Sequence, residues 1–203
     1  MTTQKAPVDF YFDFSSPYGY FGSLHIEKLA TQYGRAVNWH AILLGPAFKL
    51  MNCAPLANIP LKGDYSRRDM ERTARFKNIF FKQPEVFPIA SQAAARAVLW
   101  VQQNDAAKTA SFIHTLYSAY FTENIDISDA DHVLRIAGDL GIDAAQLREA
   151  LNGDAIKQAL KAEVSAALER GVFGSPFTIV DDEAFWGFDR FDQLEAFLKN
   201  GKI

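Results

Sequence analysis

A serine stands where an aromatic-rich strand is expected to run into a helix. Val8–Phe14 alternates in the manner of a strand, and Ser16-Pro17 follows as an N-cap with proline at the first helical position. A helix N-terminus carries unpaired N–H groups and a partial positive charge, so it stabilises an anion such as a thiolate. A hydroxyl there can donate a hydrogen bond to the same anion. Ser16 is therefore predicted to hold a thiolate, with a plain N-cap as the alternative.

The chain has one cysteine, Cys53, so the thiol must be brought in from outside. One cysteine cannot form an internal disulfide, a Cys-x-x-Cys redox pair or a cysteine-based zinc site. This count excludes a dithiol oxidoreductase. A free thiol has a pKa of about 8.5, and lowering it by about two units corresponds to roughly 2.7 kcal/mol. A helix N-terminus and one charge-assisted hydrogen bond are together strong enough for that.

Two segments near the C-terminus have the residue types to complete such a site. Ser175-Pro176 opens a short β-rich run, where the proline can be cis and the N–H and C=O of Ser175 are expected to be free for an extended, peptide-like ligand. The second segment is Trp186-Gly-Phe-Asp-Arg190. Asp189 in this segment is expected to cap the last helix, and it can also bind an ammonium group. For both segments an ordinary structural role is the alternative.

The elements expected around these residues fall into three groups. The chain opens with a strand, a helix ending at Gly34 and a second strand over 36–44, which together predict a βαβ unit. It closes with strands over 176–180 and 184–186 and a helix over 189–198. Residues 45–62 contain three prolines and are expected to be irregular. Helices are expected between these ends over 66–81, 91–104, 106–121, from a cap at Ser128 to near 140, 144–151 and 154–170.

This order predicts an α/β, thioredoxin-like fold (βαβ…ββα) with a large all-helical insertion. The predicted domains are a thioredoxin-like part formed by 1–44 and 172–203, and a helical insertion over 45–171. Parallel strands and the helices that follow them place ligands beyond the carboxyl ends of the strands. The three segments would therefore meet at one edge of the sheet.

Composition excludes several classes of function. The net charge is −3 over 203 residues with both signs mixed, so no nucleic-acid partner is expected. No apolar run approaches the roughly 20 residues that span a bilayer, and no secretory leader is evident, so no membrane association and a cytoplasmic protein are expected. The four histidines form no ligand cluster, so no metal site is expected. No serine-hydrolase elbow or phosphate-binding glycine loop is present.

Taken together, the motifs resemble a known family. Phe-x-Ser-Pro-Tyr, Gly-Val-Phe-Gly-x-Pro-x-Thr and Phe-Trp-Gly-x-Asp-Arg are similar to those of 2-hydroxychromene-2-carboxylate isomerases. These are relatives of kappa-class glutathione transferases within the DsbA-like thioredoxin superfamily. The resemblance covers nearly the whole chain and is loosest in the middle.

The resemblance implies glutathione as cofactor, a small aromatic substrate and a homodimer. It implies that Ser16 is the catalytic residue, as a hydrogen-bond donor to the glutathione sulfur. It places the substrate beside Phe48 or Lys49. The residues implied to bind glutathione are Ser16, Pro17, Tyr18, Asn52, Lys62, Ser175, Pro176, Trp186, Gly187, Phe188 and Asp189.

The chain departs from the family pattern at two of these positions. Ser175 stands where Val or Leu is usual, and Phe188 where a small or polar residue is usual. These departures bear on the substrate more than on glutathione, because main-chain contacts do not depend on side-chain identity.

Three functions follow as hypotheses. The first is a glutathione-dependent isomerase acting on 2-hydroxychromene-2-carboxylate or a related aromatic keto acid in aromatic-compound degradation. There the thiolate adds, a double bond becomes single and rotates, and the thiol leaves. The second is a kappa-like glutathione transferase or peroxidase. The third is a non-catalytic DsbA-like binding protein.

Overall fold

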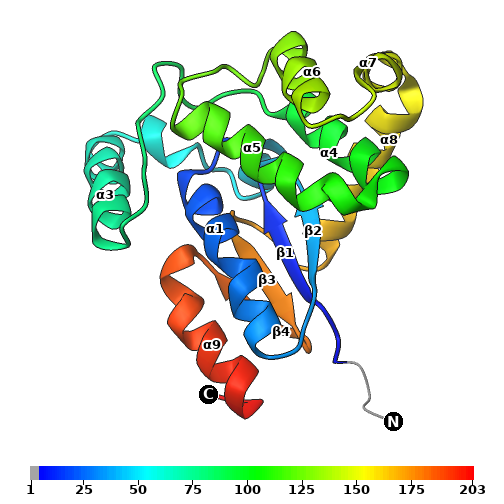
Figure 1. The fold of residues 1–203 in the computed structure, drawn as a ribbon. Coiled ribbons are helices and arrows are strands. Elements are labelled where there is room, and N and C mark those ends of the chain that lie inside the picture. Colours follow the sequence, from blue (N-terminus) through cyan, green and yellow to red (C-terminus); the bar gives the residue numbers. More distant parts are fainter. Residues whose placement is uncertain (1–4) are drawn as a thin grey trace.

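Four strands form the mixed sheet at the centre of the protein. The computed structural model describes residues 5–203. The strands run in the order β2-β1-β3-β4, with β1 parallel to β2 and antiparallel to β3, and β3 antiparallel to β4. This is the predicted βαβ…ββα arrangement (Figure 1). The strands are β1 (Val8–Phe12), β2 (Val37–Ala41), β3 (Phe177–Val180) and β4 (Glu183–Trp186).

Alternation along β1 gives the sheet two different faces. Phe10 lies opposite Trp39 and Thr178, so these side chains share a face. Helix α1 (Pro17–Gln32) covers this face, and its Gly22 allows it to lie close to the Phe10 ring. Asp9 and the other odd-numbered residues of β1 point to the opposite face.

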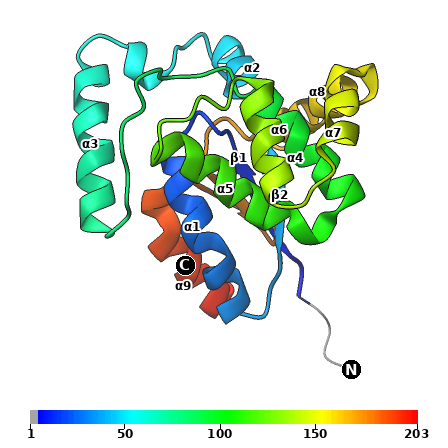
Figure 2. The ribbon, with the colours of Figure 1, turned by 45° about the horizontal axis from the view of Figure 1, so that its top comes forward.

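The remaining helices lie mainly between β2 and β3 in the sequence. Figures 1 and 2 show α4 to α8 gathered beyond one end of the sheet, with α3 standing apart beside α1. The helices after α1 are α2 (Leu44–Leu50), η1 (Leu56–Asn58, 3-10), α3 (Lys62–Phe76), α4 (Gln92–Asn104), η2 (Ala106–Lys108, 3-10), α5 (Thr109–Phe121), α6 (Ala130–Asp139), α7 (Ala144–Asn152), α8 (Asp154–Glu169), η3 (Phe188–Arg190, 3-10) and α9 (Phe191–Asn200).

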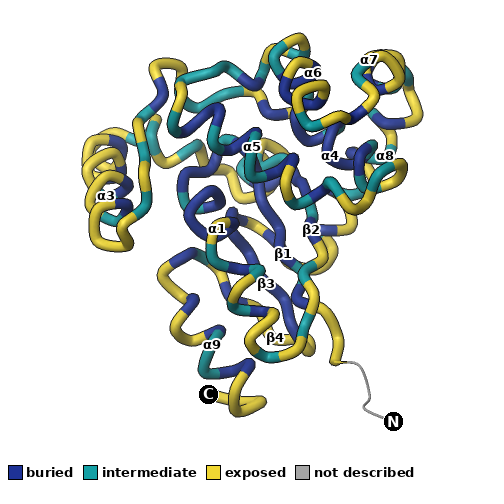
Figure 3. Tube along the Cα trace, in the orientation of Figure 1, coloured by how far each residue is buried: buried dark blue, intermediate teal, exposed yellow. Residues whose placement is uncertain are grey.

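The helical part and the sheet share one apolar core. The ring of Tyr117 on α5 lies 4.8 Å from that of Phe14 and 5.9 Å from that of Phe12. All three side chains are essentially fully buried. Figure 3 shows β1 and the inward-facing parts of α1, α4 and α5 as buried. The division into 1–44 with 172–203, and 45–171, stays a prediction.

The region after β2 is more regular than expected. Residues 45–62 contain α2 and η1, and α3 covers 62–76 rather than the expected 66–81. Pro46 lies in the first turn of α2, where a missing N–H costs nothing. Asn78 has a positive φ of 54°, and this left-handed residue follows the end of α3.

The helix caps are confirmed at the first helix and corrected at two others. Ser16 caps α1, and Gly34 follows it with φ of 69°. Helix α6 is capped by Asp129, not by Ser128, because the Asp129 carboxylate accepts the Asp131 N–H. The expected cap by Asp189 is wrong: a 3-10 turn comes first, and α9 starts at Phe191 with no side-chain cap.

Two features are absent from the described residues, 5–203. Within them, no helix is long and apolar enough to cross a bilayer. The same part of the chain contains no group of three or more His, Cys, Asp or Glu placed to hold a metal ion.

Candidate functional site

Ser16 lies at the carboxyl end of β1, at the start of α1. Its Oγ accepts the Gly19 N–H at 3.0 Å, which is the expected N-cap bond. The same hydroxyl donates to the main-chain carbonyl of Ser175 at 2.7 Å. The two segments, 159 residues apart, therefore meet directly, as the sequence predicted.

The first turn of α1 offers one free main-chain donor. Pro17 has no N–H, and the Gly19 N–H is taken by Ser16. The Tyr18 N–H has no acceptor among residues 5–203. This N–H and the Ser16 hydroxyl are the groups that an anion at the helix start would meet.

Ser175 is buried at the same place, and its peptide bond to Pro176 is cis, as considered from the sequence. Its carbonyl was expected to be free, but it already accepts the Ser16 hydroxyl. A carbonyl has two lone pairs, so one remains for a ligand. The Ser175 N–H has no acceptor in the described chain. The Ser175 Oγ points inward and accepts the Asp13 N–H at 3.0 Å.

Asp13 is a buried acid that the sequence reasoning missed. Its Oδ1 accepts the Ser15 N–H at 2.9 Å and the Ser91 hydroxyl at 2.6 Å, and its Oδ2 accepts the Leu44 N–H at 2.8 Å. Burial raises the pKa of this carboxyl, and the three donors oppose that rise. Asp13 thus joins the starts of α1, α2 and α4. The signal in the sequence was a lone acid at the end of an aromatic strand.

Tyr117 and Gly19 complete the packing behind Ser16. The Tyr117 hydroxyl donates to the Asp13 carbonyl at 3.0 Å, and burial raises the pKa of this phenol well above its usual value. A Cβ on Gly19 would lie 2.6 Å from Ser175 Oγ and 2.7 Å from the Tyr117 hydroxyl. Any larger residue at this position would have to displace these hydroxyl groups. Tyr117 lies within an apolar helical pattern, so nothing in the sequence distinguished it from other core residues.

The segment over 186–189 lies next to Pro176, because the Gly187 N–H donates to the Pro176 carbonyl at 2.9 Å. Trp186 is 56% exposed and packs edge-on against Phe173. Phe188 is buried against α1, with its ring 6.0 Å from that of Phe21, so its side chain belongs to the core. Asp189 is exposed and pairs with Arg190.

The four predicted residues after β2 lie at the surface around α2 and α3. Phe48 is half-buried, and Lys49, Asn52 and Lys62 are exposed. No side-chain hydrogen bond or ion pair ties these three polar residues to the rest of the described chain.

Helix α3 is nevertheless tied to the start of α1. The Tyr18 hydroxyl donates to the Asp69 carboxylate at 2.5 Å, and burial together with this carboxylate raises the pKa of Tyr18. Asp69 also pairs with Arg72. Lys62 begins the helix that this contact anchors.

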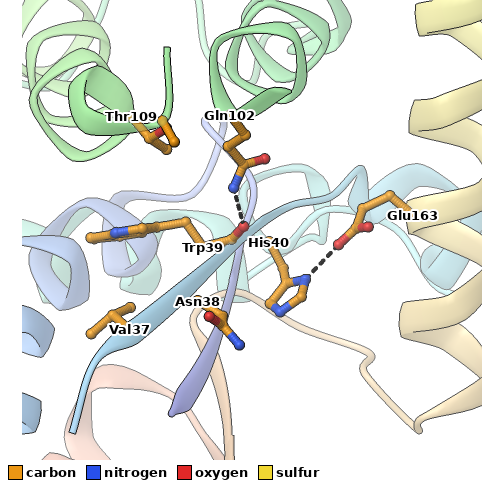
Figure 4. Close-up of a pocket in the computed structure, with 8 residues that line it drawn as sticks. Val37, Asn38, Trp39, His40, Gln102, Thr109 and Glu163 are labelled. Carbon is orange, nitrogen blue, oxygen red and sulfur yellow. Dashed lines mark hydrogen bonds and ion pairs between the residues drawn. The ribbon is translucent and has the colours of Figure 1, made fainter. Parts of the chain in front are cut away.

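A hollow of about 420 Å³ lies beside β2 and includes none of the predicted site residues. Two polar contacts lie in its lining: His40 Nδ1 lies 2.6 Å from Glu163 Oε1, and Gln102 donates to the Trp39 carbonyl at 2.6 Å (Figure 4). The hollow shares no residue with the Ser16 site.

Known proteins share both the sequence and this fold. The family model described as the DSBA-like thioredoxin domain matches residues 7–199. The 2-hydroxychromene-2-carboxylate isomerase of Sphingobium xenophagum is 32% identical over 197 residues, covering 94% of this chain and 97% of that protein. A solved structure of 2-hydroxychromene-2-carboxylate isomerase matches with a TM-score of 0.85 at 28% identity, covering 95% and 94% of the two chains.

A more distant relative is the glutathione S-transferase kappa 1 of Caenorhabditis elegans. It is 23% identical over 204 residues, covering 95% of this chain and 90% of the relative. The predicted thioredoxin-like fold with a helical insertion is confirmed by these matches. The chain belongs to the DsbA-like thioredoxin family and, within it, to the family of 2-hydroxychromene-2-carboxylate isomerases.

Proposed function

We propose that this protein is a glutathione-dependent isomerase of 2-hydroxychromene-2-carboxylate or a related aromatic keto acid. The observation that carries the proposal is the hydrogen bond between the Ser16 hydroxyl and the Ser175 carbonyl. It supports the proposal because a hydroxyl, a helix N-terminus and a main-chain edge meet at this bond. The family of the chain supports the choice of reaction.

The donors at this place suit a cysteinyl thiol. The Tyr18 N–H can point at a sulfur anion, and the Ser16 hydroxyl can do so when its proton turns from the Ser175 carbonyl. The helix N-terminus favours the charge of that anion. The Ser175 N–H and the free lone pair of its carbonyl can pair with the main chain of an extended tripeptide. Bound glutathione supplies a thiolate nucleophile for covalent catalysis.

The remaining contacts extend the proposal along the ligand. Trp186, Gly187, the main chain of Phe188, and Asp189 would hold the γ-glutamyl end, where Asp189 can meet its ammonium group. Asn52 and Lys62 would meet the glycyl end, and Phe48 or Lys49 the aromatic substrate.

The decisive experiment measures the thiol pKa of bound glutathione from thiolate absorbance near 240 nm. We expect the wild-type protein to lower it by about two units from the usual value near 8.5, and Ser16→Ala to remove most of that shift. Ser15→Ala is the matched control, because the Ser15 hydroxyl instead accepts the Ile89 N–H at 3.2 Å. No thermal shift with millimolar glutathione would refute the proposal and favour a binding protein without this cofactor.

Kappa-class relatives make glutathione conjugation the second candidate. Product analysis separates the two reactions, because isomerisation returns free glutathione and conjugation consumes it. We expect full recovery of glutathione with 2-hydroxychromene-2-carboxylate as substrate. The homodimer and the cytoplasmic location stay predictions.

A further inference from the structure

Two hydroxyl groups bind the main chain of Asp13, one at its N–H and one at its carbonyl. The Asp13 N–H donates to Ser175 Oγ at 3.0 Å, and the Tyr117 hydroxyl donates to the Asp13 carbonyl at 3.0 Å. The two hydroxyls lie side by side beneath Gly19. Ser175 Oγ accepts from Asp13, so its own proton is free for another acceptor. Burial raises the pKa of Tyr117, and a hydrogen bond with the Ser175 hydroxyl opposes that rise. Asp13, Ser175 and Tyr117 therefore contact one another in one buried cluster.

This set controls the turn that carries Ser16. The Asp13 carbonyl also accepts the Ser16 N–H at 2.9 Å, which closes the turn between β1 and α1. Ser175 binds this turn through two hydrogen bonds. Its Oγ accepts the Asp13 N–H, and its carbonyl accepts the Ser16 hydroxyl. Movement of the main chain at Asp13 would therefore shift Ser16 relative to the Ser175 carbonyl.

We infer that Tyr117 and the Ser175 side chain are positioning residues that orient the Ser16 hydroxyl. Neither hydroxyl needs to touch the ligand, because both are buried and directed at Asp13. They act by fixing which way Ser16 points. The single proton of the Ser16 hydroxyl points at the Ser175 carbonyl. Rotation of the hydroxyl would turn this proton toward a sulfur next to Ser16. The inference about thiol chemistry rests on the proposed function, whereas the inference about Ser16 orientation does not.

Hydrogen exchange at the Gly19 amide tests the orientation without any ligand. This N–H is protected by Ser16 Oγ, so release of Ser16 exposes it. We expect Tyr117→Phe to speed its exchange about tenfold, the effect of losing one buried hydrogen bond. Tyr120→Phe is the matched control, because Tyr120 is equally buried on α5 but donates to the Val86 carbonyl at 2.8 Å. Equal exchange of Gly19 in the two variants would overturn the inference.

A pair of similarly shaped variants isolates the Ser175 hydroxyl. Ser175→Thr keeps the hydroxyl and Ser175→Val removes it, at nearly equal side-chain volume. We expect the Gly19 amide of the threonine variant to exchange at nearly the wild-type rate. The Gly19 amide of the valine variant should exchange about tenfold faster. If the two variants behave alike, packing alone decides the effect and the hydroxyl has no positioning role.

The thiol pKa of bound glutathione gives a second readout that a merely structural role would not move. We expect Tyr117→Phe to raise it by about half a unit to one unit, and Tyr120→Phe to leave it unchanged. In a Ser16→Ala background, Tyr117→Phe should have no further effect, because it acts through Ser16. An additive effect there would refute the inference. Failure of wild-type protein to lower the thiol pKa, with Gly19 exchange as expected, would refute only the proposed function.

Discussion

The buried carboxylate of Asp13 allows a stability prediction with a sign and a size. Both of its oxygens accept hydrogen bonds, from two donors at Oδ1 and from the Leu44 N–H at Oδ2. In Asp13→Asn the amide oxygen can keep the two donors at one position. Its NH₂ group then faces the Leu44 N–H, so one hydrogen bond is replaced by two opposed donors.

The size follows from the bond that is lost. Leaving the partly buried Leu44 N–H without an acceptor costs about 1–3 kcal/mol, and relief from burying a charge offsets part of this. We expect Asp13→Asn to lower the free energy of unfolding by about 2 kcal/mol at pH 7. Urea unfolding followed by circular dichroism measures it, with an unchanged m-value as the sign that only stability has changed.

The control and the pH dependence sharpen the test. Asp143→Asn makes the same chemical change at an exposed N-cap, where Asn is as good as Asp, so its effect should be far smaller than that of Asp13→Asn. Burial raises the pKa of Asp13, so this carboxyl stabilises the fold most when it is protonated, which is the case below pH 3.8. The difference between wild type and Asp13→Asn should narrow as the pH rises through the raised pKa. An Asn variant as stable as wild type at pH 7 would refute the three-donor account.

Three further predictions concern other positions. Gly19→Ala gains about 1 kcal/mol of helix propensity but places a Cβ 2.6 Å from Ser175 Oγ. We therefore expect a net loss of about 1–2 kcal/mol in the free energy of unfolding and a lower Tm in calorimetry. An unchanged Tm would show that the Ser175 and Tyr117 hydroxyls can move aside without cost. Burial pushes the pKa of Asp9 up, but hydrogen bonds from Arg170 and Asn38 outweigh it and hold the pKa below 3.8. The stability from these bonds is present above pH 3.8 and is lost as the pH falls through the lowered pKa. Asp9→Asn should therefore lower the free energy of unfolding in urea by about 1 kcal/mol at pH 7 and not at all at low pH. A loss of stability that persists in acid would contradict this. Gly174→Ala would put a Cβ 2.1 Å from Trp186 Nε1 and displace the indole, so titration calorimetry should find glutathione binding about tenfold weaker, and equal affinity would argue against the Trp186 contact.

Local chemistry in the sequence was enough to place the main elements around the sheet. The N-cap at Ser16 and the left-handed end at Gly34 each depend on residues within one helical turn. The alternation in β1 likewise predicts a strand from its own residues. These features needed no distant partner, and they are the ones that the structure confirms.

The sequence also determined that any thiol at the site must come from outside, since Cys53 is alone and lies in an exposed loop. The family motifs directed attention to Ser16, Ser175 and the segment after Trp186. Their meeting was an inference from strand order, and the bond between Ser16 and Ser175 now gives it a distance of 2.7 Å.

Only the tertiary structure decided which groups orient Ser16 and where the helices after β2 begin. Helix α2 starts at Leu44 because the N–H of that residue reaches Asp13, 31 positions earlier. Tyr117 and Ser175 contact the main chain of Asp13 from 104 and 162 positions away. Such contacts leave no pattern in the local sequence. The acceptor of a buried donor is the group that lies next to it in the folded core, and this group can come from any part of the chain.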